Sequence, residues 1–172
     1  MRVCVVGSGG REHALAVALA RTASVVVAPG NPGMVAADPG IGGGVAGGSV
    51  LECSAQPPEA VEADLFVIGP ETALAGGLAD RLRSAGKLVF GPGADGARLE
   101  GSKAWMKALL VDAGVPTAAY RAFTEVDPAV EFLKALGHGP YVVKTDGLAA
   151  GKGVLVAATL DEAIDDVRAK LD

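Results

Sequence analysis

Four short apolar segments each end at a turn that contains glycine or proline, and this repeated arrangement constrains the fold most strongly. The segments cover residues 3–6, 24–28, 64–68 and 88–90, and they are closed by Gly7, Pro29, Gly69 and Gly91. Apolar runs of this length between turn residues are typical of buried strands. Because helices are expected between them, over residues 12–21 and 74–85, the sequence predicts βαβ units and a parallel sheet.

A different order of elements begins near Ser102. This serine is a good N-cap for a helix that ends near Asp112, and Gly114 fits the C-terminal cap. The elements expected after it are a strand over 120–123, a helix over 128–136, strands over 141–144 and 154–157, and a helix over 160–171. Residues 41–58 are rich in glycine and carry no clear pattern.

The predicted fold class is α/β. A Rossmann-like domain with a parallel sheet is expected over residues 1–102, then a linker helix and connection over 103–119, and an incomplete α+β subdomain over 120–172. Because the last subdomain stops on a charged helix with no closing strand, we expect the chain to be a piece of a longer protein.

The composition indicates a globular protein with an aliphatic core, since 50% of the 172 residues are hydrophobic but only 4% are aromatic. A net charge of −5 and the lack of a basic cluster argue against a nucleic-acid partner. No segment approaches the roughly 20 apolar residues that span a bilayer, and the first apolar run is too short for a signal peptide. We therefore expect a cytoplasmic protein without a membrane partner. No sequence pattern indicates an oligomeric state.

The first turn, Gly7-Ser-Gly-Gly-Arg-Glu12, invites comparison with the dinucleotide-binding fingerprint G-x-G-x-x-G. Glu12 stands where that fingerprint needs its third glycine, and the second strand ends at Pro29 without the acid that binds ribose hydroxyls. An NAD(P)-binding domain is therefore disfavoured. The start of the helix remains suited to an anion, which Arg11 can bind with two hydrogen bonds. The alternative is a tight turn with a surface arginine.

Polar residues also follow the second and third strands. Asn31 and Glu71 fall just beyond the carboxyl ends of these strands, which is where ligands bind in open α/β sheets. Helix capping is the alternative for Glu71. His13 fits a packing role in the first helical turn and His138 fits an exposed loop, so neither is predicted to be catalytic.

Residues 140–154 predict two strands joined by a glycine-rich loop, whose backbone N–H groups could cover a polyphosphate. The loop is not a Walker P-loop, because that motif leads into a helix. Lys144 follows three apolar strand residues, so we expect it in a partly buried space where its ammonium needs an anion. Lys152 lies in the loop, and Lys103 could meet the same phosphates. The alternative is an exposed hairpin with incidental lysines.

Taken in order, these motifs resemble the amino-terminal part of the phosphoribosylamine–glycine ligases (glycinamide ribonucleotide synthetases), ATP-grasp enzymes of purine biosynthesis. The resemblance covers essentially the whole chain. Its motifs are Gly7-Ser-Gly-Gly-Arg-Glu-His-Ala14, Pro29-Gly-Asn-Pro-Gly33, Gly69-Pro-Glu71, Phe90-Gly-Pro92, Leu99-Glu-Gly-Ser-Lys-Ala104, Val115-Pro-Thr-Ala118 and Lys144-Thr-Asp-Gly-Leu-Ala-Ala-Gly-Lys-Gly153. The sequence departs from the family pattern at Thr145, usually alanine, and at Ala73, often proline.

The resemblance implies a pre-ATP-grasp domain followed by part of an ATP-grasp fold. It also implies a ligation in which ATP phosphorylates the carboxylate of glycine and the amine of 5-phosphoribosylamine then displaces phosphate. The residues implied for ATP are Lys103, Lys144, Gly147, Gly151, Lys152 and Gly153. Those implied for the phosphoribosylamine and glycine side are Gly9, Gly10, Arg11, Glu12, Asn31 and Glu71. No protein nucleophile is needed.

The resemblance further implies that the carboxylate and asparagine ligands of Mg²⁺, and the segment that contacts adenine, lie beyond Asp172. We therefore expect these 172 residues alone to lack ligase activity and to bind ATP weakly. Two further alternatives remain open. One is another ATP-grasp ligase with a different acid substrate, although such ligases lack the Gly-Gly-Arg-Glu-His start. The other is a non-catalytic interaction fragment in which the glycine loop is only a turn.

Overall fold

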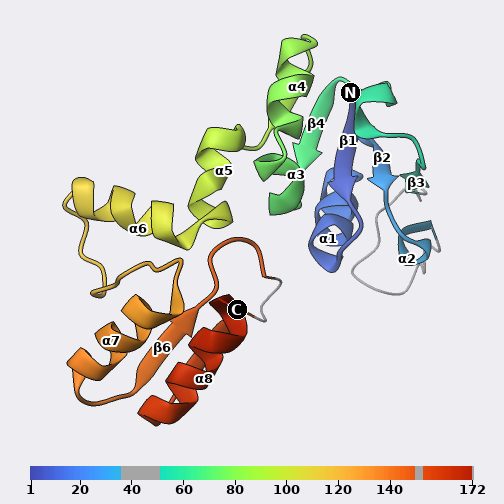
Figure 1. The fold of residues 1–172 in the computed structure, drawn as a ribbon. Helices are drawn as coiled ribbons and strands as arrows, with labels where there is room; N and C mark the ends of the chain where they lie inside the picture. Colours follow the sequence, from blue (N-terminus) through green and yellow to red (C-terminus); the bar gives the residue numbers. More distant parts are fainter. Residues whose placement is uncertain (36–50, 150–152, 172) are drawn as a thin grey trace. The chain divides into compact units, whose positions relative to one another are not determined.

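The computed structural model describes residues 1–35, 51–149 and 153–171, which fall into two compact units, Met1–Ala97 and Arg98–Asp172. The first unit contains a five-stranded parallel sheet in the order β3-β2-β1-β4-β5 (Figure 1). The strands are β1 (Arg2–Gly7), β2 (Ser24–Pro29), β3 (Glu52–Cys53), β4 (Leu65–Ile68) and β5 (Leu88–Phe90). The predicted α/β class with a parallel sheet is confirmed.

The central strand, β1, pairs in parallel with β2 on one side and β4 on the other. Such a strand is covered on both faces, which explains its continuous apolar run. The register sets Gly7 opposite Pro29 of β2, and Val6 opposite Ile68 of β4. The three strands therefore end at the same level, and the turns that follow them are neighbours.

Helices cover both faces of this sheet. On the face that carries Val3 and Val5, α1 (Gly10–Leu19) and α2 (Pro32–Val35) contribute Ala16 and Met34 to the core. On the other face, which carries Phe66, lie α3 (Glu71–Ala75) and α4 (Leu78–Ser84). The alternation of side chains along each strand thus divides the core into two layers.

The sequence predicted α3 and α4 as one helix over residues 74–85. The structure contains two helices, because the chain turns at Gly76 and Gly77 and the latter adopts a left-handed conformation with a φ of 75°. A short 3-10 helix, η1 (Pro58–Ala60), precedes β4. Within residues 41–58, for which no pattern was found, the described part supplies the edge strand β3.

The second unit is built on an antiparallel hairpin of β6 (Tyr141–Lys144) and β7 (Val154–Ala157). On one face, α7 (Val126–Leu136) and α8 (Leu160–Leu171) pack around Tyr141 and Ala157. On the other face, Val142 and Val156 are exposed. Two further helices, α5 (Ala94–Gly101) and α6 (Lys103–Asp112), precede this hairpin in the chain. The strands predicted over residues 141–144 and 154–157 and the predicted last helix are confirmed.

The strand predicted over residues 120–123 is wrong. This segment has no strand beside it in the part of the chain that the structure describes. Instead, Lys107 Nζ donates hydrogen bonds to Thr117 Oγ1 (2.6 Å) and to the carbonyl of Ala118 (3.0 Å), and Phe123 packs on Phe132 with ring centroids 5.4 Å apart. Side-chain contacts therefore replace a strand pairing. The sequence analysis also did not predict helix α5.

Phe66 and Phe90 lie on the adjacent strands β4 and β5, but the first is fully buried and the second is 72% exposed. We expect Phe66→Ala to lower the free energy of unfolding of the first unit by about 3–5 kcal/mol, because it leaves a cavity in the core. The control, Phe90→Ala, should change it by about 0.5 kcal/mol or less. Urea unfolding followed by far-UV circular dichroism measures both effects, while the fluorescence of Trp105, the single tryptophan, reports on the second unit. Equal losses in the two variants would contradict the packing described.

Candidate functional site

The carboxylate of Glu12 is the centre of the candidate site in the first unit. The residue is 4% exposed and is the one buried charged residue among those that the structure describes. Its Oε2 accepts a hydrogen bond from the N–H of Gly9 (2.7 Å), and its Oε1 accepts one from Arg11 Nε (3.1 Å). Glu12 is the third residue of α1, and Gly9 is the N-cap, so the first bond is half of a capping box. These partners offset the cost of burying the charge.

Three glycines provide the space that this carboxylate occupies. A Cβ atom on Gly7 or on Gly69 would lie 2.5 Å from Glu12 Cγ, and one on Gly9 would lie 2.8 Å from Oε2. Two of these glycines belong to the turn after β1, and the third follows β4. The glycine-rich turn thus accommodates a protein carboxylate, where the dinucleotide fingerprint would have a third glycine.

Arg11 connects the same two turns from the outside. Its Nη2 donates hydrogen bonds to the carbonyl of Gly69 (2.6 Å) and to Glu71 Oε2 (3.3 Å). The hydrogen bonds to Glu12 and then to Glu71 raise the pKa of Arg11. A hydrogen bond from its own backbone N–H, followed by the one from Arg11, lowers the pKa of Glu71. Both side chains are charged at neutral pH, and that of Arg11 is 62% exposed, so a ligand can reach it.

Asn31 brings the turn after β2 into the same group. Its Nδ2 donates to the carbonyl of Ser8 (2.7 Å), and its Oδ1 accepts from the N–H of Gly33 (2.8 Å). In addition, the N–H of Gly30 donates to the carbonyl of Gly7 (3.1 Å). The structure therefore brings together the residues that the sequence predicted for the substrate side, namely Gly9, Gly10, Arg11, Glu12, Asn31 and Glu71. All but Gly10 and Asn31 line a cavity of about 660 Å³.

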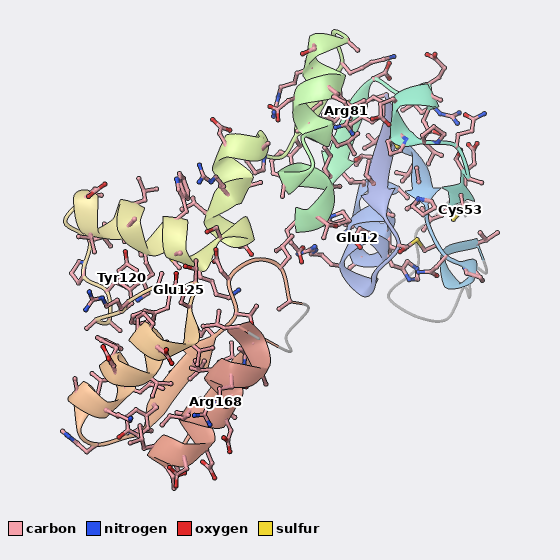
Figure 2. All side chains as sticks on the ribbon, viewed as in Figure 1. Glu12, Cys53, Arg81, Tyr120, Glu125 and Arg168 are labelled. Atoms are coloured by element: carbon pink, nitrogen blue, oxygen red, sulfur yellow. The ribbon has the colours of Figure 1, made fainter. Side chains whose placement is uncertain are left out.

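Sequence reasoning missed an ion pair that also lines this cavity. Arg81 of α4 contacts Glu59 of η1 through Nη2 (3.0 Å) and Nε (3.1 Å), and its Nη1 donates to the carbonyl of Gly76 (2.7 Å). Figure 2 shows Arg81 well apart from Glu12, on a different helix. Arg81 and Glu59 are 22 positions apart in the chain, and no local pattern links them. This pair is therefore not part of the group around Glu12.

The residues predicted for ATP belong to the second unit. Lys103 opens α6, and its Nζ donates a hydrogen bond to the carbonyl of Gly147 (2.7 Å). The N–H of Thr145 donates to the carbonyl of Gly153 (2.7 Å), which closes the base of the glycine loop. The structure thus places Lys103 against this loop. Two residues predicted for the site, Gly151 and Lys152, lie outside the described residues.

Lys144 ends β6 and is exposed, so the expected partial burial is wrong. The strand alternates, and Lys144 lies on the same face as Val142, opposite the face that packs on α7 and α8. Three apolar residues before a lysine indicated burial, but only alternate ones, Tyr141 and Val143, face the core of this unit. The ammonium group is therefore accessible to a ligand.

Asp146 connects the glycine loop to α6, and sequence reasoning missed it. Its Oδ2 accepts a hydrogen bond from Ser102 Oγ (2.9 Å), and its Oδ1 accepts one from the N–H of Ala104 (3.1 Å). Burial alone would raise the pKa of this carboxyl, but the hydrogen bonds from Ala104, Ser102 and other groups outweigh it and lower the pKa. A negative charge at a helix N-terminus is also favourable. The contact spans 44 positions, which a local pattern does not reveal.

No group of three or more histidine, cysteine, aspartate or glutamate side chains that could bind a metal ion occurs among the described residues. Within the same residues, no helix combines the length and the apolar composition needed to cross a membrane.

A parallel α/β domain with a glycine-lined turn at its carboxyl edge, followed by a hairpin with a lysine and a glycine loop, has the architecture of the amino-terminal portion of an ATP-grasp ligase. Residues 1–100 match the family model of the phosphoribosylglycinamide synthetase N domain, and residues 101–172 match that of the ATP-grasp (A) domain of the same synthetase. The chain belongs to the phosphoribosylglycinamide synthetase family.

Comparisons with individual proteins lead to the same family. A phosphoribosylamine–glycine ligase of Escherichia coli is 46% identical over 171 residues, which are 98% of this chain and 39% of the relative. The crystal structure of a phosphoribosylamine–glycine ligase from Thermotoga maritima matches 96% of this chain and 38% of its own, with a TM-score of 0.72 and 30% identity. An N5-carboxyaminoimidazole synthase from Aspergillus clavatus, solved with ADP and 5-aminoimidazole ribonucleotide, shares the fold at 18% identity, over 96% of this chain and 43% of its own, with a TM-score of 0.67. The chain thus spans about two fifths of the length of its relatives.

The lowered pKa of Asp146 predicts how the stability of the second unit depends on pH. Because the pKa is lower in the folded state, the carboxylate stabilises the fold fully above the ordinary value of 3.8, and this stabilisation is lost as the pH falls through the folded-state pKa. Asp146→Asn should therefore remove part of the increase in stability between about pH 2 and pH 5. Urea unfolding followed by Trp105 fluorescence measures this increase.

The exposed Asp165 provides the control for this experiment, since its carboxylate pairs with Arg168 of the same helix, α8. Asp165→Asn should keep the pH dependence of the wild-type chain. A profile of Asp146→Asn parallel to that of the wild type would show that the carboxylate does not contribute as described.

Proposed function

We propose that the protein containing this chain ligates glycine to 5-phosphoribosylamine in purine biosynthesis, with conversion of ATP to ADP and phosphate, to give glycinamide ribonucleotide. The observation that carries the proposal is that this chain, a member of the family, contains two features together. One is the turn of residues 7–12 with Arg11 bound to Gly69, called the Arg11 turn below, and the other is the hydrogen bond from Lys103 to Gly147. The chain spans 39% of the E. coli ligase, so the proposed activity is that of the whole enzyme. We propose that this enzyme is cytoplasmic.

The first unit would contribute to the binding of the two substrates 5-phosphoribosylamine and glycine. Arg11 offers a guanidinium already fixed by protein acceptors, which suits a phosphate or a carboxylate. Glu71 offers an ionised carboxylate that could accept hydrogen bonds from hydroxyl or ammonium groups. The backbone of Gly9 and Gly10 lies at the start of α1, where the helix dipole favours an anion, although the N–H of Gly9 already donates to Glu12. Asn31 supports the same turn through Ser8.

The second unit would bind the phosphates of ATP. Lys103 and Lys144 supply positive charge, and the loop that includes Gly147, Gly151, Lys152 and Gly153 would cover the phosphates. The related synthase from A. clavatus, whose structure contains ADP, supports a nucleotide in this fold. Mg²⁺ is expected for the family, but the described residues provide no group of three or more histidine, cysteine, aspartate or glutamate side chains that could bind it.

In the first chemical step, a carboxylate oxygen of glycine would attack the γ-phosphorus of ATP, and ADP would leave. In the second, the amine of 5-phosphoribosylamine would attack the carbonyl carbon of the glycyl phosphate, and phosphate would leave as the amine loses a proton. The first step brings two anions together, and the second expels phosphate, so neutralisation of negative charge by lysine and arginine and correct positioning would supply the catalysis. Closure of the glycine loop would exclude water, which would otherwise hydrolyse the acyl phosphate.

A chimera tests this proposal, with residues 1–172 in place of the matching segment of the E. coli ligase. It should form ADP only when both glycine and 5-phosphoribosylamine are present, and mass spectrometry should detect glycinamide ribonucleotide. Lys144→Ala should lower kcat/KM for ATP by about 10- to 100-fold, since a charge-assisted phosphate contact is lost. Lys134→Ala, which removes an exposed lysine of α7, should change it less than about twofold.

Two results would count against the proposal. One is a folded chimera that forms ADP without any dependence on glycine. The other is equal activity of the Lys144→Ala and Lys134→Ala variants, which would make the hairpin an incidental surface feature.

A further inference from the structure

We propose that Glu12 is the positioning residue of the Arg11 turn: its buried carboxylate fixes the guanidinium of Arg11 and joins the turns after β1 and β4, without contact to the substrate. The inference rests on the proposed function, because it concerns how the substrate turn is built. It also changes the role of Glu12 from the substrate contact expected from the sequence to a support for that contact.

The environment of the carboxylate argues against direct contact with a ligand. Both of its oxygens already have donors within the protein, Gly9 N–H for one and Arg11 Nε for the other. The positions that Cβ atoms of Gly7 and Gly69 would take lie 2.5 Å from Glu12 Cγ, so the backbone encloses the side chain. With 4% of the residue exposed, little surface remains for a substrate to reach. Glu12 therefore meets the cavity with only a small part of its surface.

The same contacts fix Arg11 before any ligand arrives. A free arginine side chain populates many rotamers, and ordering it on binding costs about 0.5–1.5 kcal/mol. Here Nε is bound to Glu12, and Nη2 is bound to the carbonyl of Gly69 and to Glu71. Two of the three nitrogen atoms of the planar guanidinium are therefore bound, and its orientation is set before an anion arrives.

Electrostatics and positioning predict opposite effects when Glu12 is neutralised. The carboxylate is a negative charge in direct contact with the guanidinium, so its removal alone would strengthen the binding of an anion. If Glu12 orients Arg11, its removal releases the Nε edge and weakens binding instead. The sign of the change in affinity therefore decides between the two roles.

The test measures the binding of ribose 5-phosphate, a stable analogue of phosphoribosylamine, to the 172-residue chain by isothermal titration calorimetry. Glu12→Gln keeps the shape of the side chain and an acceptor for Gly9, and we expect it to raise the Kd at least about fivefold. Glu62→Gln, which neutralises an exposed carboxylate of the same unit, should change the Kd less than about twofold. An unchanged or lower Kd for Glu12→Gln would overturn the inference.

A double-mutant cycle with Arg11→Lys separates positioning from direct contact, because lysine keeps a positive charge but has no Nε to bind Glu12. In the Arg11→Lys background, Glu12→Gln should no longer raise the Kd. An equal increase in both backgrounds would mean that Glu12 contacts the ligand itself, and the inference would be wrong.

A measurement on the wild-type chain covers the case in which Glu12→Gln does not fold. The ¹⁵N–¹H signal of Arg11 Nε should be protected from exchange with solvent at neutral pH, because Nε–H donates to a buried carboxylate. Rapid exchange of this proton would overturn the inference. If the wild-type chain does not bind ribose 5-phosphate at all, the proposed substrate site fails, while the exchange of Nε–H still decides whether Glu12 fixes Arg11.

Discussion

Parallel pairing of β1 with a strand on each side is the constraint on which the first unit depends. It requires both faces of β1 to be covered, and it makes β1, β2 and β4 end at one edge of the sheet. Three turns that are far apart in sequence are thereby brought together. Their shared hydrogen bonds, from Gly30 to Gly7 and from Gly69 to Val6, continue the strand pairing into the turns. The site is a direct consequence of the sheet.

The dinucleotide fingerprint and the turn found here share a backbone but differ in one side chain. In the fingerprint, the third glycine lets the helix pack closely on the strand. Here Glu12 occupies that position and turns inward, and Gly69 of a different turn makes room for it. The sequence shows that the third glycine is missing. It does not show the direction of Glu12, because that depends on a glycine 57 residues away, brought close only by the fold.

The elements that sequence patterns predicted correctly are those with local causes. The strands β1, β2, β4 and β5 are apolar runs closed by turns, and Ser102 caps α6 through the N–H of Trp105 as expected. The errors concern segments whose conformation or exposure depends on residues that are distant in the sequence. The sequence of residues 120–123 is typical of a strand, but Phe123 packs its apolar side chain against Phe132 of α7 instead. Likewise, the exposure of Lys144 depends on which face of the hairpin α7 and α8 cover.

The two candidate sites differ in how far this chain completes them. Around Arg11, the charged groups of Arg11, Glu12 and Glu71 are already paired with one another, so the arrangement of these side chains does not depend on a ligand. In the second unit, Asp146 fixes the start of the glycine loop to α6, whereas Lys103 donates to the carbonyl of Gly147, a neutral acceptor. Under the proposed function, a phosphate oxygen would be a stronger acceptor for the ammonium group than this carbonyl, so a bound nucleotide would compete with Gly147 for Lys103. Asp146 would keep the hydrogen bonds from Ser102 and Ala104 in either case, because neither of these groups involves Lys103 Nζ.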